Sequence, residues 1–201
     1  MVKQVLKMTI AGMCLIVAVG CGGKKVTRVE TDTTIDLSGR WNDADSRMVA
    51  EEMIKDCLSK PWYNRYEGAN AVPRVIVGKI RNRSHEHINT ETFIKDIERT
   101  LINSGKVEFV ASKEEREQIR EERDDQMADN ASDETVKADG QEVGADLMLY
   151  GSINTIADTE GDETVMYYQT DLELVEIESN RKVWIGTKKI KKYITRGKAK
   201  L

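Results

Sequence analysis

The sequence predicts an α+β domain built on one mixed sheet. Two observations lead to this class. Amphipathic helical patterns are gathered between residues 42 and 143, with two short β-branched segments among them. Three long segments of strand character, separated by tight turns, then follow one another from residue 147 to residue 194. Helices early in a chain and a meander of strands late are typical of helices layered on a sheet.

The composition is that of a water-soluble protein with one domain. Of the 201 residues, 39% are hydrophobic and 33% are charged, and the net charge is -4. An acidic chain lacks the basic footprint of general nucleic-acid binding, so we expect no nucleic-acid partner. The cysteines are Cys14, Cys21 and Cys57. We expect the first to leave with a leader and the second to be modified, so the stability of the domain should come from its core rather than from disulfides.

Residues 1–20 have the pattern of a secretory signal peptide. Two lysines precede an uncharged apolar run that is too short to span a membrane, and the small residue Gly20 stands directly before Cys21. The segment Ala18-Val19-Gly20-Cys21 resembles a bacterial lipobox, although Ala18 stands where leucine is usual. We therefore expect cleavage between Gly20 and Cys21 and a diacylglycerol on the Cys21 thiol. The alternative is an ordinary secreted protein that is cut at the same small residue.

Residues 21–38 are polar and rich in threonine, and they show no periodicity. We expect them to form a flexible tether. The globular domain is then predicted to occupy residues 39–201.

The first predicted helix begins at Asn42, whose side chain can cap the free N–H groups of the first turn. Pro61 is expected to end it. The run Trp62–Tyr66 either packs under the domain or forms a partner-binding patch, since exposed aromatics are favoured at interfaces. The helix should bury a stripe with i, i+4 spacing, which includes a cysteine as core filler: Val49, Ala50, Met53, Ile54, Cys57 and Leu58.

Residues 74–80 predict a central strand that is covered on both faces, because they are nearly continuous in β-branched residues. A loop follows, and then a helix that begins at Asn89 or Thr90 and closes at Ser104-Gly105. Residues 106–110 are a second predicted strand. The helix should bury one face, made of Phe93, Ile94, Ile97 and Leu101.

Ser112 begins a capping box for a highly charged surface helix. A short helical piece is expected at residues 135–143. Three long strands are then predicted, with turns at Glu160-Gly161-Asp162 and Ser179-Asn180-Arg181. These strands start at residues 147, 165 and 183.

A catalytic constellation is not evident in the sequence. His85 and His87 could share a metal, but no third ligand is marked, and a surface loop is the simpler interpretation. There is no phosphate-binding glycine motif and no serine in a nucleophile elbow. We predict no enzymatic activity, no metal and no cofactor.

Charge is distributed unevenly along the chain. Residues 114–134 carry ten acidic residues against three arginines, whereas residues 188–201 carry seven basic residues and no acid. Such asymmetry favours steered association with a charged partner, the alternative being a solvated strand end with a frayed tail. The candidate partner-binding residues are Lys188, Lys189, Lys191 and Lys192.

Four segments follow one another in the chain: LSGRWND at 37–43, VGKIRNRS at 77–84, LINSGKV at 101–107 and GADLMLYG at 144–151. Together with the lipobox, these segments resemble the LpoB-type penicillin-binding protein activators. The similarity runs from about Leu37 to Tyr193.

The resemblance implies a domain similar to the N-terminal domain of TolB, with helices on both faces of a sheet. It also implies a non-catalytic outer-membrane lipoprotein that faces the periplasm and stimulates a bifunctional peptidoglycan synthase, a penicillin-binding protein. The residue after Cys21 is Gly22 in place of aspartate, and in this the chain is similar to lipoproteins that are sorted to the outer membrane. The tether is shorter than the linker of family members that reach through peptidoglycan, and it has no proline. An envelope assembly lipoprotein that uses the same domain for another partner is the alternative.

Overall fold

The computed structural model describes residues 26–132, 134–137, 140 and 142–195. The chain divides into two compact units, and every helix and strand named below lies in the second, residues 34–201. The signal peptide and Cys21 lie outside the described residues. In chain order the elements are α2 (Asp43–Leu58), α3 (Pro61–Gly68), β1 (Arg74–Arg83), α4 (Thr90–Asn103), β2 (Glu108–Phe109), α5 (Lys113–Asp125), the π-helical segment η1 (Gln126–Asn130), β3 (Leu147–Glu160), β4 (Glu163–Glu176) and β5 (Lys182–Thr195).

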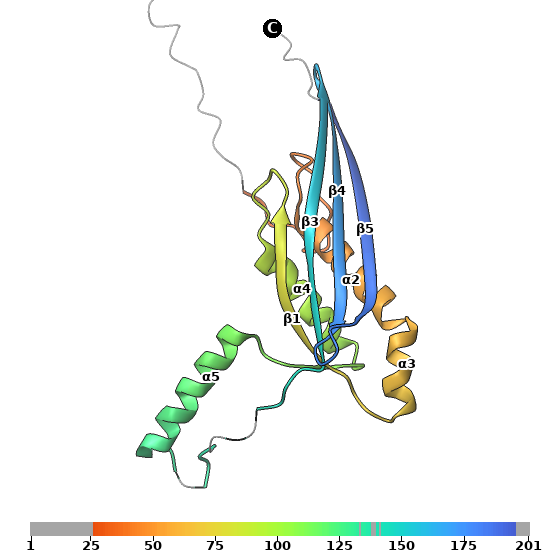
Figure 1. The fold of residues 1–201 in the computed structure, drawn as a ribbon. Helices are drawn as coiled ribbons and strands as arrows, with labels where there is room; N and C mark the ends of the chain where they lie inside the picture. Colours follow the sequence, from red (N-terminus) through yellow and green to blue (C-terminus); the bar gives the residue numbers. More distant parts are fainter. Residues whose placement is uncertain (1–25, 133, 138–139, 141, 196–201) are drawn as a thin grey trace, which may run out of the picture. The chain divides into compact units, whose positions relative to one another are not determined.

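The sheet has five strands in the order β2-β1-β3-β4-β5 (Figure 1). β1 runs parallel to β2 and β3, while β3, β4 and β5 are antiparallel neighbours. The predicted mixed sheet is therefore confirmed. The strand expected at residues 106–110 shrinks to two residues, Glu108 and Phe109, which pair only with Arg74 and Val75.

Helices α2 and α4 pack on the same face of the sheet, behind it in the view of Figure 1. Buried and partly exposed residues alternate along β4 from Met166 to Leu174, as they do at the start of β1. The expectation of helices on both faces is therefore wrong, and so is that of a β1 covered on both faces. Apolar side chains on the open face, such as Ile76, misled the sequence pattern because they are only half-buried.

Helix α2 follows the sequence prediction closely. Asn42 and Asp45 form a capping box, with the Asn42 side chain accepting from the Asp45 N–H at 3.0 Å. The predicted apolar stripe is buried throughout, and Cys57 is 2% exposed. The cap satisfies N–H groups of the first turn, and burial of the apolar stripe decides which side of the helix faces the core.

Helix α3 was not predicted, although Pro61 at its first position is typical of a helix start. Proline has no N–H to lose at the first helical position, so Pro61 both ends α2 and begins α3. The Trp62 side chain is buried and donates to the Cys57 carbonyl at 2.7 Å. Tyr63 and Tyr66 pack edge-on against Trp62, which confirms the packing interpretation of this aromatic run.

Helix α4 begins after Asn89, whose side chain accepts from the N–H groups of Glu91 and Thr92. It ends at Asn103 with Ser104 as its C-cap, and Gly105 follows with φ of 65°. A left-handed backbone conformation just after a helix favours glycine, and Gly105 was predicted to close this helix. Of the predicted stripe, Phe93, Ile97 and Leu101 are buried and Ile94 is partly buried.

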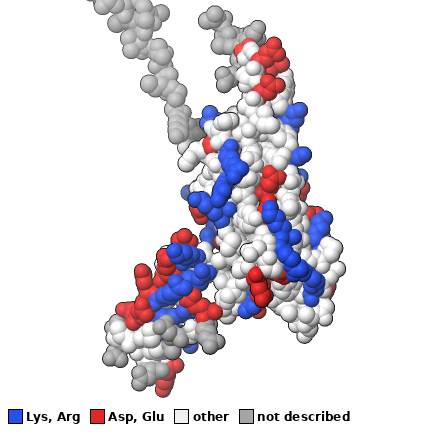
Figure 2. Space-filling model, in the orientation of Figure 1, with Lys and Arg blue, Asp and Glu red and all other residues white. Residues whose placement is uncertain are grey.

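Helix α5 is a surface helix with no buried residue. The Ser112 capping box is present, and Glu115 also accepts from Lys95 Nζ at 2.8 Å, which joins α5 to α4. The helical piece expected at 135–143 is wrong within the described residues, where Glu134 and Thr135 form a turn. Figure 2 shows acidic and basic side chains interspersed over α5.

The three long strands are joined by the predicted turns. Gly161 has φ of 57° and Asn180 has φ of 58°, both in the left-handed region that such turns require. β3 continues to Glu160, beyond the alternating apolar positions, because its polar end still pairs with β4 through Glu160 and Glu163. None of the helices in the described ranges is long and apolar enough to cross a membrane.

The segment before α2 is attached to the sheet. The Glu86 carboxylate accepts from the Trp41 N–H at 3.1 Å and from the Tyr168 hydroxyl at 2.9 Å. Gly39, with φ of 69°, lies against Ile194. Residues 39–41 therefore belong with the domain, while the flexible tether stays a prediction.

Candidate functional site

The four lysines proposed as a docking patch do not share one face of β5. Alternate residues of a strand point to opposite faces. Lys188 and Lys192 lie on the side of the helices, and Lys189 and Lys191 are exposed on the open face. Gly20 and Cys21, the predicted cleavage and lipid-attachment residues, lie outside the described residues.

Lys192 is held in an ion cluster with one buried and one exposed carboxylate. Its side chain is 12% exposed, and Nζ contacts Asp45 at 2.6 Å and Asp36 at 2.8 Å. Burial opposes its positive charge, but the hydrogen bonds that Lys192 donates to Asp36 and Asp45 outweigh this effect and raise the pKa of Lys192. Lys192 therefore fixes the segment around Asp36 to the first turn of α2.

The other three lysines differ in their partners. Lys188 forms an ion pair with Glu52 of α2. Lys189 and Lys191 make no ion pair with any residue in the described part of the chain. Two cationic side chains thus remain available on the open face.

His85 and His87 are both exposed in the loop after β1. No group of three possible metal ligands forms among the described residues. Cys57 is buried, and burial raises the pKa of its thiol to about 12. A buried, protonated thiol packs in the core and does not act as a nucleophile.

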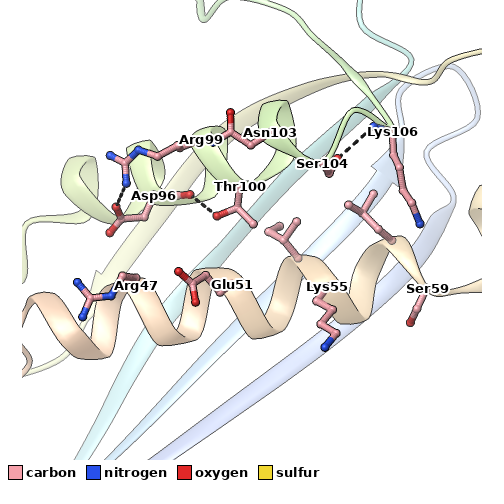
Figure 3. Close-up of a pocket in the computed structure, with 12 residues that line it drawn as sticks. Arg47, Glu51, Lys55, Ser59, Asp96, Arg99, Thr100, Asn103, Ser104 and Lys106 are labelled. Carbon is pink, nitrogen blue, oxygen red and sulfur yellow. Dashed lines mark hydrogen bonds and ion pairs between the residues drawn. The ribbon is translucent and has the colours of Figure 1, made fainter. Parts of the chain in front are cut away.

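A groove of about 650 Å³ runs between α2 and α4. In Figure 3, one wall is formed by residues at every fourth position of α2 and its C-cap, and the other by α4. Ile54 and Leu58 supply apolar lining. The labelled polar residues are Arg47, Glu51, Lys55, Ser59, Asp96, Arg99, Thr100, Asn103, Ser104 and Lys106.

The rim of the groove carries more positive than negative charge. Four basic residues line it against two acidic ones, and Asp96 is already paired with Arg99 at 2.9 Å. Lys106 Nζ lies 5.3 Å from the centroid of the Tyr63 ring, which stabilises its position by a cation–π interaction. The groove therefore suits a partner with apolar and acidic side chains.

The hydroxyl groups that line the groove are used by the helices themselves. Ser59 Oγ donates to the Asp56 carbonyl at 2.6 Å, and Thr100 Oγ1 donates to the Asp96 carbonyl at 2.8 Å. Ser104 Oγ donates to the Leu101 carbonyl at 2.6 Å. These bonds are typical of helix interiors and ends, and they leave no hydroxyl beside a base.

Sequence reasoning did not find this groove. A signal was present, because Arg47, Glu51, Lys55 and Ser59 follow one another at i, i+4 spacing beside the buried stripe of α2. Such a row marks a helix flank. It could not show which other helix would face that flank.

The surface that the structure describes carries an open charged groove and an exposed lysine pair on a mixed sheet, which makes it a candidate docking surface. The family model "Peptidoglycan-synthase activator LpoB" matches residues 45–190, and the chain belongs to this family. The family consists of regulatory activators rather than enzymes. No curated protein matches the chain.

Solved structures resemble the chain at low identity. The LpoB C-terminal domain from Salmonella enterica is 16% identical, with a TM-score of 0.42 over 73% of this chain and 98% of that one. Lipoprotein GNA1162 from Neisseria meningitidis is 14% identical, with a TM-score of 0.40 over 63% and 88%. The LpoB C-terminal domain from Escherichia coli is 18% identical, with a TM-score of 0.35 over 65% and 93%.

Proposed function

We propose that this protein is an outer-membrane lipoprotein that binds a bifunctional peptidoglycan synthase in the periplasm and stimulates it without chemistry of its own. The observation that carries the proposal is the family match over residues 45–190. The lipobox-like segment that ends at Cys21 supports the anchor. The penicillin-binding protein is thus the partner, and the lipid holds the activator on the inner surface of the outer membrane.

The groove between α2 and α4 is the proposed docking site on the helical side. Its apolar lining offers surface that a partner can cover, and its basic rim favours an acidic rim on that partner. Lys55 is exposed at this rim, one turn from the end of α2. Reversing its charge should weaken binding mainly by slowing association.

The test is glycan polymerisation by the organism's own bifunctional synthases, with and without the mature lipoprotein in detergent. We expect faster polymerisation with the wild-type chain. Lys55→Glu should need a higher concentration for the same stimulation, whereas Lys79→Glu, an equal charge change on β1, should behave as the wild type.

Two results would contradict these proposals at different levels. An unchanged polymerisation rate and no binding for every synthase would reject the activator function in favour of an assembly lipoprotein. If Lys55→Glu stimulates as well as the wild type, the groove is not the docking site, while the proposed activator function is still supported.

A further inference from the structure

The outer edge of β5 is an unpaired strand edge. β5 is the last strand of the sheet and pairs with β4 alone (Figure 1). Its 14 residues extend for about 45 Å at the usual rise per residue. Along such an edge, alternate backbone N–H and C=O groups point away from the sheet. No other strand pairs with them in the part of the chain that the structure describes.

This edge is more regular than the edge on the other side of the sheet. β2 covers the start of β1, and a bulge interrupts β1 between Val77 and Ile80. The pairing of β5 is unbroken from Trp184 to Thr195. A regular edge can accept another strand over its whole length, whereas a bulge turns an edge away.

The open-face side chains of β5 form a stripe with an apolar or aromatic residue at each end and two lysines near its centre. Ile185 and Tyr193 are 60% and 62% exposed at its two ends. Thr187, Lys189 and Lys191 lie between them, on the same face. Because the two lysines lack an ion-pair partner among the described residues, the centre of the stripe is complementary to acidic side chains two positions apart.

The same lysines disfavour pairing with a second copy of the chain. An antiparallel pair of β5 strands centred on the stripe would place Lys189 of one copy opposite Lys189 of the other. Like charges opposite each other destabilise a strand pair. Lysine on an edge strand is a usual protection against self-association, yet it leaves the edge open to an acidic strand.

We infer that β5 is a strand-addition site for an extended acidic segment of the synthase, an inference that rests on the function proposed above. The segment adds a sixth strand to the sheet through backbone hydrogen bonds to the outer edge of β5. Acidic side chains two positions apart pair with Lys189 and Lys191, and apolar side chains at its ends cover Ile185 and Tyr193. Backbone bonds provide the affinity in this mode of recognition, and the side chains provide the specificity.

The first test uses a probe that does not depend on the synthase. The probe is an end-capped, threonine-based peptide with a valine at each end. Between the valines it carries two aspartates that are two positions apart. Its control is the same peptide with asparagine in place of both aspartates. Peptide binding to the mature lipoprotein is measured by fluorescence anisotropy, and backbone amide exchange is followed by mass spectrometry.

We expect the aspartate peptide to bind and to slow amide exchange at residues 184–195. The double variant Lys189→Gln/Lys191→Gln should weaken binding about three- to tenfold, as loss of two exposed ion pairs predicts. The matched variant Lys79→Gln/Lys113→Gln should leave it unchanged. Protection elsewhere, equal binding of the asparagine peptide, dimer formation through β5, or lysine-dependent binding to anionic vesicles in place of the peptide would overturn the inference.

The second test uses polymerisation by the synthase. Lys189→Gln/Lys191→Gln should raise the lipoprotein concentration needed for half-maximal stimulation by a similar factor. If the wild type stimulates and the variant matches it, the edge is not the docking site and the activator function stands. If the wild type does not stimulate, the proposed function fails, and with it the choice of the synthase as partner, while the peptide result still decides whether β5 accepts an acidic strand.

Discussion

At the residue scale, the most consequential side chain is Lys192. Its ammonium group lies between Asp45 at the start of α2 and Asp36 in the preceding segment. Asp45 is 5% exposed, and its carboxylate also accepts from the Asn42 N–H at 3.0 Å. Removing the cation would leave the buried carboxylate of Asp45 without its charged partner and with the Asn42 N–H of the capping box as a donor. This arrangement makes Lys192 a structural residue, although it belongs to the lysine row that suggested docking.

We predict that Lys192→Met lowers the free energy of unfolding by about 3 kcal/mol, since breaking a buried ion pair leaves a charge without its partner. Chemical denaturation measures the change. Lys189→Met, a change on the open face of the same strand, should have almost no effect. Equal stability of the two variants would contradict the structural role of Lys192.

The effect of Lys192→Met should depend on pH. The Lys192 hydrogen bond lowers the pKa of Asp36 below 3.8, so the Asp36 contribution is present above about pH 4 and is lost as the pH falls. The pKa of Lys192 is raised above 10.5, so its contribution is lost only as the pH rises beyond that value. The stability difference between wild type and variant should therefore be greatest between about pH 5 and pH 10. A constant difference down to pH 3 would argue against the ion cluster.

Cys57 gives a second prediction at this scale. Its thiol is buried between α2 and the sheet, and burial raises its pKa, so a labelling reagent should reach it only on unfolding. Labelling followed by peptide mapping should be slow in the native protein and fast in denaturant. Cys57→Ala should cost about 1–2 kcal/mol, because it removes one small buried group. Rapid native labelling would show that this face of α2 is open.

At the element scale, the close approach of β3 and β4 depends on Gly151. A Cβ at this position would overlap the backbone carbonyl of Asp171 and the Leu172 side chain. Gly151 lies opposite Leu172 of β4, and only the paired strand shows why a larger residue is excluded. Glycine is required here because the β4 backbone lies too close for a Cβ, and not because of the φ angle of this residue.

We predict that Gly151→Ala lowers the free energy of unfolding by about 3 kcal/mol, because the added methyl meets backbone that cannot move without breaking the β3–β4 ladder. Gly144→Ala is the matched control, since no atom lies within 4 Å of a Cβ added there. Urea unfolding of both variants measures the difference. Similar midpoints would mean that the strands separate at little cost.

At the scale of the whole molecule, the proposed lipid anchor at Cys21 concerns where the domain acts. We predict that mass spectrometry of the mature N-terminus finds an acylated Cys21, because Gly20-Cys21 ends a lipobox-like segment. Cys21→Ser should leave the precursor unprocessed. An unmodified N-terminus at another residue would contradict the anchor and support an ordinary secreted protein.

The sequence by itself determined the local elements of this protein. The cap at Asn42, the stripe that ends at Leu58, the capping box at Ser112 and the turns at Gly161 and Asn180 all depend on near neighbours in the chain. Periods of 3.6 and 2 residues and the backbone preferences of asparagine and glycine are properties of short segments. These predictions therefore held without knowledge of the fold.

Only the tertiary structure decided which faces are covered and which side chains meet. Half-buried Ile76 reads like a core residue, so the sequence could not show that the helices leave one face of the sheet open. The groove between α2 and α4 and the bond of Lys192 to Asp45, 147 positions away, join residues that no local rule connects. The separation of Lys192 from Lys191 follows from the pleat of a strand with one face against α2 and the other uncovered. Long-range packing gave these neighbouring lysines different roles because each face of β5 meets a different environment.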